Sequence, residues 1–195
     1  MLLRTDIIET ASAEFSERGY HQTSIADIAK RLGIGHGTFY RHFKNKRDIL
    51  DHVIDDVSSK ISDTLLNENA PGAVNSLDDY REQCQRISSQ LANIVMDNPS
   101  TARLILLEAT SIDPEMTERI MVFLDWAAKL VSAYMEHGVK LGFFREDLDA
   151  EATGHVIVGL IMTSALSFLR SPDDKVMQQR MADAVLRIMV DGIGV

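Results

Sequence analysis

The sequence has little of what marks secreted, membrane-bound or disordered chains. It contains one cysteine and four prolines in 195 residues, so an internal disulfide is impossible and Pro-rich low-complexity sequence is excluded. No run approaches the roughly 18 uninterrupted apolar residues of a membrane span. Acidic residues interrupt the N-terminal stretch MLLRTDIIETASAEF, where a secretory signal would be purely apolar. We therefore expect a cytoplasmic protein that has no membrane partner.

Charge is distributed unevenly along the chain. The whole sequence carries −9 at pH 7, which argues against indiscriminate coating of nucleic acid. Residues 1–52 carry +1 and the remainder carries −10. Residues 28–47 hold six Lys or Arg, two histidines and no acid. A basic segment at one end of an acidic chain indicates a local anionic partner, although a solvated basic face has the same pattern.

Apolar residues recur at intervals of three and four along nearly the whole chain, which predicts an all-α fold of about nine helices. Gly19 and Gly33 are typical of positions just after helix ends. Ser24 and Asp27 have the spacing of a capping box that begins a helix. Further helices are expected from Leu77 through Val95, with a break near Asn98-Pro99, and over about 100–110, 115–140, 150–169 and 175–190.

Residues 24–43 predict a helix-turn-helix. Ala29 is small enough for two helices to cross, Gly33 allows a turn with positive φ, and Ile34 and Phe39 would pack the second helix onto the first. The outer face of the second helix carries donors and small residues that suit a DNA major groove. That face consists of His36, Gly37, Thr38, Tyr40, Arg41 and His42. Thr23, Ser24 and Lys46 lie at helix starts, where they would bind phosphates.

The stretch from Ala29 to Leu50, AKRLGIGHGTFYRHFKNKRDIL, resembles the DNA-binding domain of the tetracycline-repressor (TetR) family. The similarity covers about residues 4–55, and it implies a homodimeric repressor whose two heads occupy successive major grooves of double-stranded operator DNA. It also implies that His36, Gly37 and Thr38 lie closest to the bases. Tyr40, His42 and Lys46, with Thr23 or Ser24, would contact the DNA backbone. Gly35 replaces the serine cap that is frequent in the family, so we expect a slightly looser recognition helix.

The C-terminal part is where a small-molecule effector is expected to bind. It contains eight of the nine methionines, whose side chains adapt to apolar ligands, although filling of the core would need the same residues. The family resemblance implies that some of these residues line a pocket. The residues expected there are Met96, Leu104, Met121, Trp126 and Met162.

A broad apolar face on the last two helices predicts dimerisation. Pairing these helices with their symmetry mates would bury the face in a four-helix interface, whereas burial within one subunit is the alternative. Gly154 and Gly159 would allow close helix approach. The residues of the predicted interface are Val156, Ile157, Leu160, Ile161, Ser164, Phe168, Val185, Ile188 and Met189.

The sequence thus predicts two domains, a DNA-binding domain over 1–52 and a domain for ligand binding and dimerisation over 53–195. We expect a ligand-responsive repressor that a small molecule releases from DNA. His36 and His42 are six residues apart, which does not suit a shared metal, and no nucleophile elbow or phosphate loop is visible. We therefore expect no metal site, cofactor or catalytic activity. The alternatives are a helical sensor that lacks specific DNA binding and an all-α enzyme.

Overall fold

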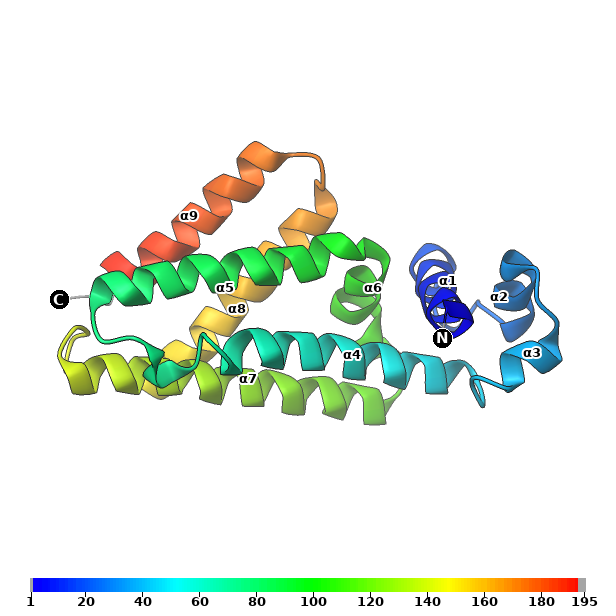
Figure 1. The fold of residues 1–195 in the computed structure, drawn as a ribbon, viewed down its shortest axis with the longest axis horizontal. Helices are drawn as coiled ribbons and strands as arrows, with labels where there is room; N and C mark the ends of the chain where they lie inside the picture. The colour runs from blue at the N-terminus through cyan, green and yellow to red at the C-terminus, as the bar shows by residue number, and fades with distance from the viewer. Residues whose placement is uncertain (1, 193–195) are drawn as a thin grey trace. The chain divides into compact units, whose positions relative to one another are not determined.

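The computed structural model describes residues 2–192 and contains nine α-helices and no β-strand in that range (Figure 1). The helices are α1 (Leu2–Arg18), α2 (Ile25–Leu32), α3 (His36–Tyr40), α4 (Lys46–Leu66), α5 (Leu77–Asp97), α6 (Pro99–Arg103), α7 (Pro114–Leu141), α8 (Ala150–Arg170) and α9 (Lys175–Asp191). A short 3₁₀ turn, η1 (Pro71–Ala73), lies in the connection between α4 and α5. The all-α prediction is confirmed.

The chain folds into two compact units. Unit 1 comprises the residues up to Ser59 together with Asn98–Glu118, and unit 2 comprises Lys60–Asp97 together with the residues from Arg119 onward. Both α4 and α7 contribute residues to the two units. The expected boundary between residues 52 and 53 falls inside α4. The assignment of DNA binding to 1–52 and of ligand binding and dimerisation to 53–195 stays a prediction.

Unit 1 has an apolar core formed largely by the first four helices. α1 packs against α2 and α6, and α2 packs against α3. The core side chains with almost no exposed surface include Ile7, Phe15, Ile28, Phe39, Phe43, Ile49, Leu50 and Leu104. These residues follow the three-and-four spacing of the sequence, so the hydrophobic pattern accounts for which side chains enter the core.

The segment expected as one helix over residues 100–110 is divided into three parts. α6 ends at Arg103, Leu104–Glu108 forms a π-helical turn (η2), and Ala109–Ser111 forms a 3₁₀ turn (η3). A π turn accommodates one more residue than an α turn, which shifts the register of every side chain after it. Apolar periodicity predicted helical backbone here but not this local change of winding.

Unit 2 is a helical bundle in which α5, α8 and α9 pack against one another (Figure 1). Its core contains Tyr80, Cys84, Met135, Phe144 and Ile157. The close approach of α8 to α7 depends on a glycine, because a Cβ atom at Gly154 would overlap the Ser132 side chain and the Ala128 carbonyl.

Candidate nucleic-acid interface

The turn between α2 and α3 is defined by a glycine. Gly33 has φ of +68°, in the left-handed region that favours this residue. The Gly33 N–H donates to Lys30 O at 3.2 Å, and the Ile34 N–H donates to Ala29 O at 3.0 Å. These two bonds complete the last turn of α2 as a Schellman motif and direct the chain into α3.

α3 presents one buried and one exposed face. Phe39 and, just beyond the helix, Phe43 are buried, with ring centroids 6.1 Å apart. On the opposite side His36, Gly37 and Arg41 are exposed and Tyr40 keeps 55% of its surface. Thr38 and His42 are partly buried. Within residues 36–42, the side chains predicted to face DNA therefore include no member of the buried core.

Two features of α3 affect how it would contact bases. Its N-cap, Gly35, makes no side-chain cap bond, as expected from the missing serine. The Arg41 Nη2 atom donates to Thr38 Oγ1 at 3.1 Å. Because the hydroxyl hydrogen of Thr38 is not used in this bond, Thr38 and Arg41 together present several donors on the exposed face.

The start of α2 places its two hydroxyls differently. Ser24 is exposed and forms the predicted capping box, since its Oγ accepts from the Asp27 N–H at 3.2 Å and Asp27 Oδ2 accepts from the Ser24 N–H at 2.9 Å. Thr23 is buried, and its hydroxyl lies within hydrogen-bonding distance of Glu14 O (3.2 Å) and Gly19 O (3.0 Å). This burial removes the Thr23 side chain from the expected phosphate ligands.

Two arginines of the basic segment, residues 28–47, form ion pairs within the chain. Arg31 reaches two carboxylates of α1, with Nη1 2.8 Å from Glu14 Oε1 and 2.9 Å from Glu17 Oε2. The hydrogen bond to Glu17 and then that to Glu14 raise the pKa of Arg31 above its usual value. Arg47 binds Asp113 at 3.0 Å and also Asp51. Both arginines are therefore paired with carboxylates of unit 1, which charge counting along the sequence did not indicate.

Residues 7–53, which contain this helix-turn-helix, match the family profile described as "Bacterial regulatory proteins, tetR family". Residues 7–53 therefore form a DNA-binding domain of the TetR type. The chain is a transcriptional regulator with a DNA-binding helix-turn-helix, as its sequence predicted.

Named transcriptional regulators resemble the chain over nearly its whole length. The fatty acid metabolism regulator protein of Bacillus subtilis is 25% identical over 187 residues, covering 96% of this chain and 93% of the relative. The transcriptional repressor KstR2 of Rhodococcus jostii is 25% identical over 195 residues, covering 97% and 90%. The crystal structure of FadR from Bacillus subtilis in complex with stearoyl-CoA superimposes with a TM-score of 0.76 at 24% identity, covering 97% and 98%.

The residues expected to line an effector pocket fall into both units of the chain. Leu104 is fully buried in unit 1. Met96, Trp126 and Met162 are partly buried in unit 2, and Met121 is 45% exposed there. A pocket shared by all five residues stays a prediction.

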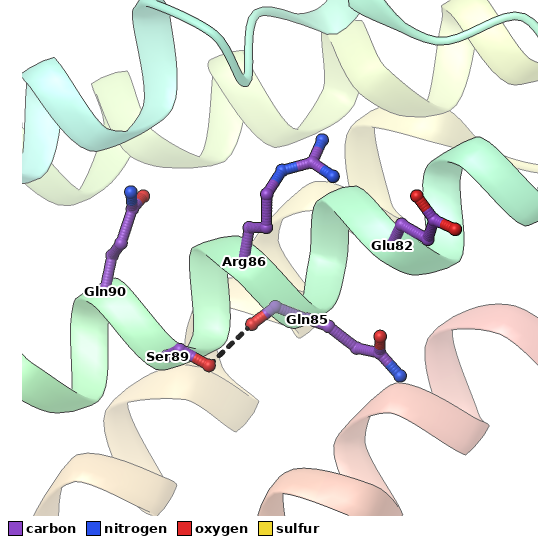
Figure 2. Close-up of a pocket in the computed structure, with 5 residues that line it drawn as sticks. All are labelled: Glu82, Gln85, Arg86, Ser89 and Gln90. Atoms are coloured by element: carbon purple, nitrogen blue, oxygen red, sulfur yellow. Dashed lines mark hydrogen bonds between the residues drawn. The ribbon is translucent and has the colours of Figure 1, made fainter.

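A polar groove of about 550 Å³ lies along α5 (Figure 2). It is lined by Glu82, Gln85, Arg86, Ser89 and Gln90, and it shares no residue with the predicted effector pocket. Figure 2 shows Arg86 pointing away from the helix on one side and Gln85 on the other.

The predicted dimer face is partly used within the subunit. Ile157 and Phe168 are buried in the monomer, and Gly154 contacts α7, so these three residues are unavailable as interface residues. Val156 and Ile188 remain 62% and 55% exposed. The other predicted residues are partly buried: Leu160, Ile161, Ser164, Val185 and Met189.

α8 has an unusual amount of apolar surface for a helix of a bundle. Among residues 2–192 it is the only helix long and apolar enough to span a membrane by composition, and most of its residues are not buried. One such helix is weak evidence for a membrane span. Exposed apolar residues on α8 and α9 are also what a helical interface between two copies requires.

Proposed function

We propose that this regulator is a cytoplasmic repressor of the TetR family that binds operator DNA as a homodimer and is released by a small-molecule effector. The observation that carries the DNA-binding proposal is the exposed face of α3. His36, Gly37, Tyr40 and Arg41 are exposed there while Phe39 is fully buried. A helix with donors and a glycine on its outer face can approach base edges closely in a major groove.

The contacts are assigned by chemistry. His36, Thr38 and Arg41 would donate to base edges, and Gly37 would let the helix backbone approach them. Tyr40, His42 and Ser24 would contact phosphates, which fix the register of the head on the duplex without reading sequence. Thr23 would make no phosphate contact, because its hydroxyl is buried.

The effector is proposed to carry a long hydrocarbon chain. The FadR relative was crystallised with stearoyl-CoA, and the methionines of unit 2 are flexible side chains that can pack around such a chain. Binding would change the separation of the two heads, so that both no longer fit half-sites at a fixed spacing. The size of this effect equals the difference in affinity of the effector for the two arrangements.

Fluorescence anisotropy with duplex DNA from upstream of the protein's own gene tests the proposal. We expect binding at physiological salt that is at least about a thousandfold tighter than to a scrambled duplex. Stearoyl-CoA should release the DNA, whereas coenzyme A alone should not. Equal, weak binding to both duplexes that disappears with modest salt would instead support a sensor or an enzyme.

A further inference from the structure

The ammonium group of Lys46, the first residue of α4, is bound by other residues of unit 1 and is partly buried. Its Nζ atom is 2.7 Å from Tyr20 O, 3.1 Å from Thr23 O and 3.5 Å from His21 O. It also lies 4.3 Å from the centroid of the Tyr20 ring. All of these partners belong to the turn between α1 and α2, so the three donors of the ammonium are matched by three carbonyl acceptors and one aromatic face.

The position of Lys46 in the chain gives this contact a wider effect. Thr23 directly precedes Ser24, the N-cap of α2, and Lys46 follows the short turn after α3. The helix-turn-helix, residues 24–40, therefore lies between the two segments that Lys46 joins. One side chain connects the entrance of the DNA-binding motif to its exit.

The turn that Lys46 binds is itself fixed on the other side. The Tyr20 N–H donates to Glu108 Oε2 at 3.2 Å, and the Tyr20 ring packs against Phe15 with centroids 5.0 Å apart. The buried hydroxyl of Thr23 binds α1 and the residue after it. The carbonyls are thus held in place before the ammonium meets them. Partial burial of this contact lowers the pKa of Lys46 by desolvation.

We propose that Lys46 is a positioning residue that holds the start of α2 against the end of the helix-turn-helix, and that it is not a phosphate ligand. This inference rests on the proposed DNA-binding function. To bind a phosphate, the ammonium would have to give up three carbonyl oxygens and the Tyr20 ring. Lys46 instead acts on DNA through the orientation of Ser24 and of α3.

Salt dependence separates the two roles. A lysine that neutralises a phosphate contributes about 0.9 to the slope of log K against log salt concentration. A dimer carries two copies, so loss of a phosphate-binding Lys46 would reduce the slope by roughly two. Loss of a positioning Lys46 weakens binding but leaves the slope of the operator complex unchanged.

The test measures operator affinity of the full-length protein by anisotropy at several salt concentrations. Lys46→Met removes the contact and the charge, Tyr20→Leu removes the aromatic face and keeps the charge, and Tyr20→Phe is the matched control. We expect Lys46→Met to bind the operator about tenfold more weakly, because charge-assisted contacts are lost. Tyr20→Leu should also weaken operator binding. Both variants should keep the salt-dependence slope of the wild type. Tyr20→Phe should bind within about twofold of the wild type, because its ring is retained.

A fourth variant and melting curves distinguish loss of the contact from loss of folding. Lys46→Gln keeps an amide donor for the carbonyls and lacks the charge, so we expect it to recover part of the affinity that Lys46→Met loses. Circular dichroism melting sets a temperature at which every variant is folded. If the Lys46 variants bound the operator as tightly as the wild type and differed only in a lower melting temperature, Lys46 would have a structural role alone. That result would overturn the proposal.

A slope smaller by about two in both Lys46 variants, with Tyr20→Leu binding as the wild type, would show a phosphate ligand and also overturn the proposal. Failure of the wild type to prefer its operator would contradict the proposed function itself. The two failures are therefore distinguishable in one set of titrations.

Discussion

Cys84 is the only cysteine of the chain, and it lies in the core of unit 2 with Tyr80 and Tyr134. Burial raises the pKa of the Cys84 thiol from its ordinary 9.0 to about 11, although a hydrogen bond with Tyr80 acts in the opposite direction. The thiolate is the reactive form of cysteine. The thiol is therefore neutral at physiological pH.

At pH 8 the folded protein should react with iodoacetamide about a hundredfold more slowly than the urea-unfolded protein, because two pKa units reduce the thiolate fraction by that factor. Mass spectrometry of the alkylated chain over time measures both rates. Raising the pH toward 11 should increase the rate in the folded state. Equal rates in the folded and unfolded states at pH 8 would contradict the burial of this thiol.

Of the two neighbouring hydroxyl residues at the start of α2, the sequence predicted the role of one and not of the other. Ser24 and Thr23 are adjacent hydroxyl residues, and the spacing to Asp27 identified the cap at Ser24 correctly. The inward position of Thr23 depends on the carbonyls of Glu14 and Gly19. Their direction is set by how α1 ends, which the identity of residue 23 does not reveal.

At the scale of elements, one glycine of the helix-turn-helix is required by its backbone conformation and another is not. Gly33 has φ of +68°, and Gly37 lies within α3 with open space where a Cβ would stand. Gly33→Ala should lower the free energy of unfolding by about 1–2 kcal/mol, because an L-residue is strained in the left-handed region. Gly37→Ala should raise it by about 0.5–1 kcal/mol, because alanine favours helix. Urea unfolding followed by circular dichroism measures both.

The Gly37 variant also tests the position of DNA. We expect Gly37→Ala to weaken operator binding while it stabilises the protein, since its methyl group stands on the face that approaches the bases. If the more stable variant bound the operator as well as the wild type does, α3 would not approach the bases closely at Gly37.

Two glycines of α8 differ in their surroundings: Gly154 packs against α7, and Gly159 lies on open surface. A Cβ at Gly154 would overlap Ser132 and Ala128, whereas Gly159 has nothing within 4 Å. Gly154→Ala should destabilise the protein by about 1–3 kcal/mol through overpacking, and Gly159→Ala should not destabilise the subunit. Thermal unfolding at one protein concentration compares them. Equal losses in the two variants would contradict the packing of α8 on α7.

Helices were predicted well where local signals are strong and less well where packing decides. The capping box and Gly33 define α2 from sequence alone. The π turn at Leu104–Glu108 has no such signal, because its apolar residues also suit an α-helix. The buried and exposed sides of α8 could not be separated either: Ile157 faces the core while the adjacent Val156 is exposed, and both are β-branched apolar residues.

At the scale of the whole molecule, the apolar residues left exposed on α8 and α9 predict a dimer. Glutamate at Val156 or Ile188 would place charge in an apolar interface, so Val156→Glu and Ile188→Glu should weaken dimerisation at least about tenfold. Val122→Glu is the matched control, because Val122 is similarly exposed, at 57%, on α7. Sedimentation velocity over a concentration series measures the dissociation constants. Dimers of unchanged stability in both test variants would place the interface elsewhere.

The most direct test of DNA reading by α3 is selection of bound sequences from a random duplex pool, with wild type and His36→Ala in parallel. The wild type should enrich a two-fold symmetric site whose half-sites suit heads in successive major grooves. His36→Ala should change the preferred base at one position in each half-site and leave the others as they were. Enrichment of no motif by the wild type, or of an identical motif by His36→Ala with affinity lost equally on every sequence, would contradict base reading by this helix.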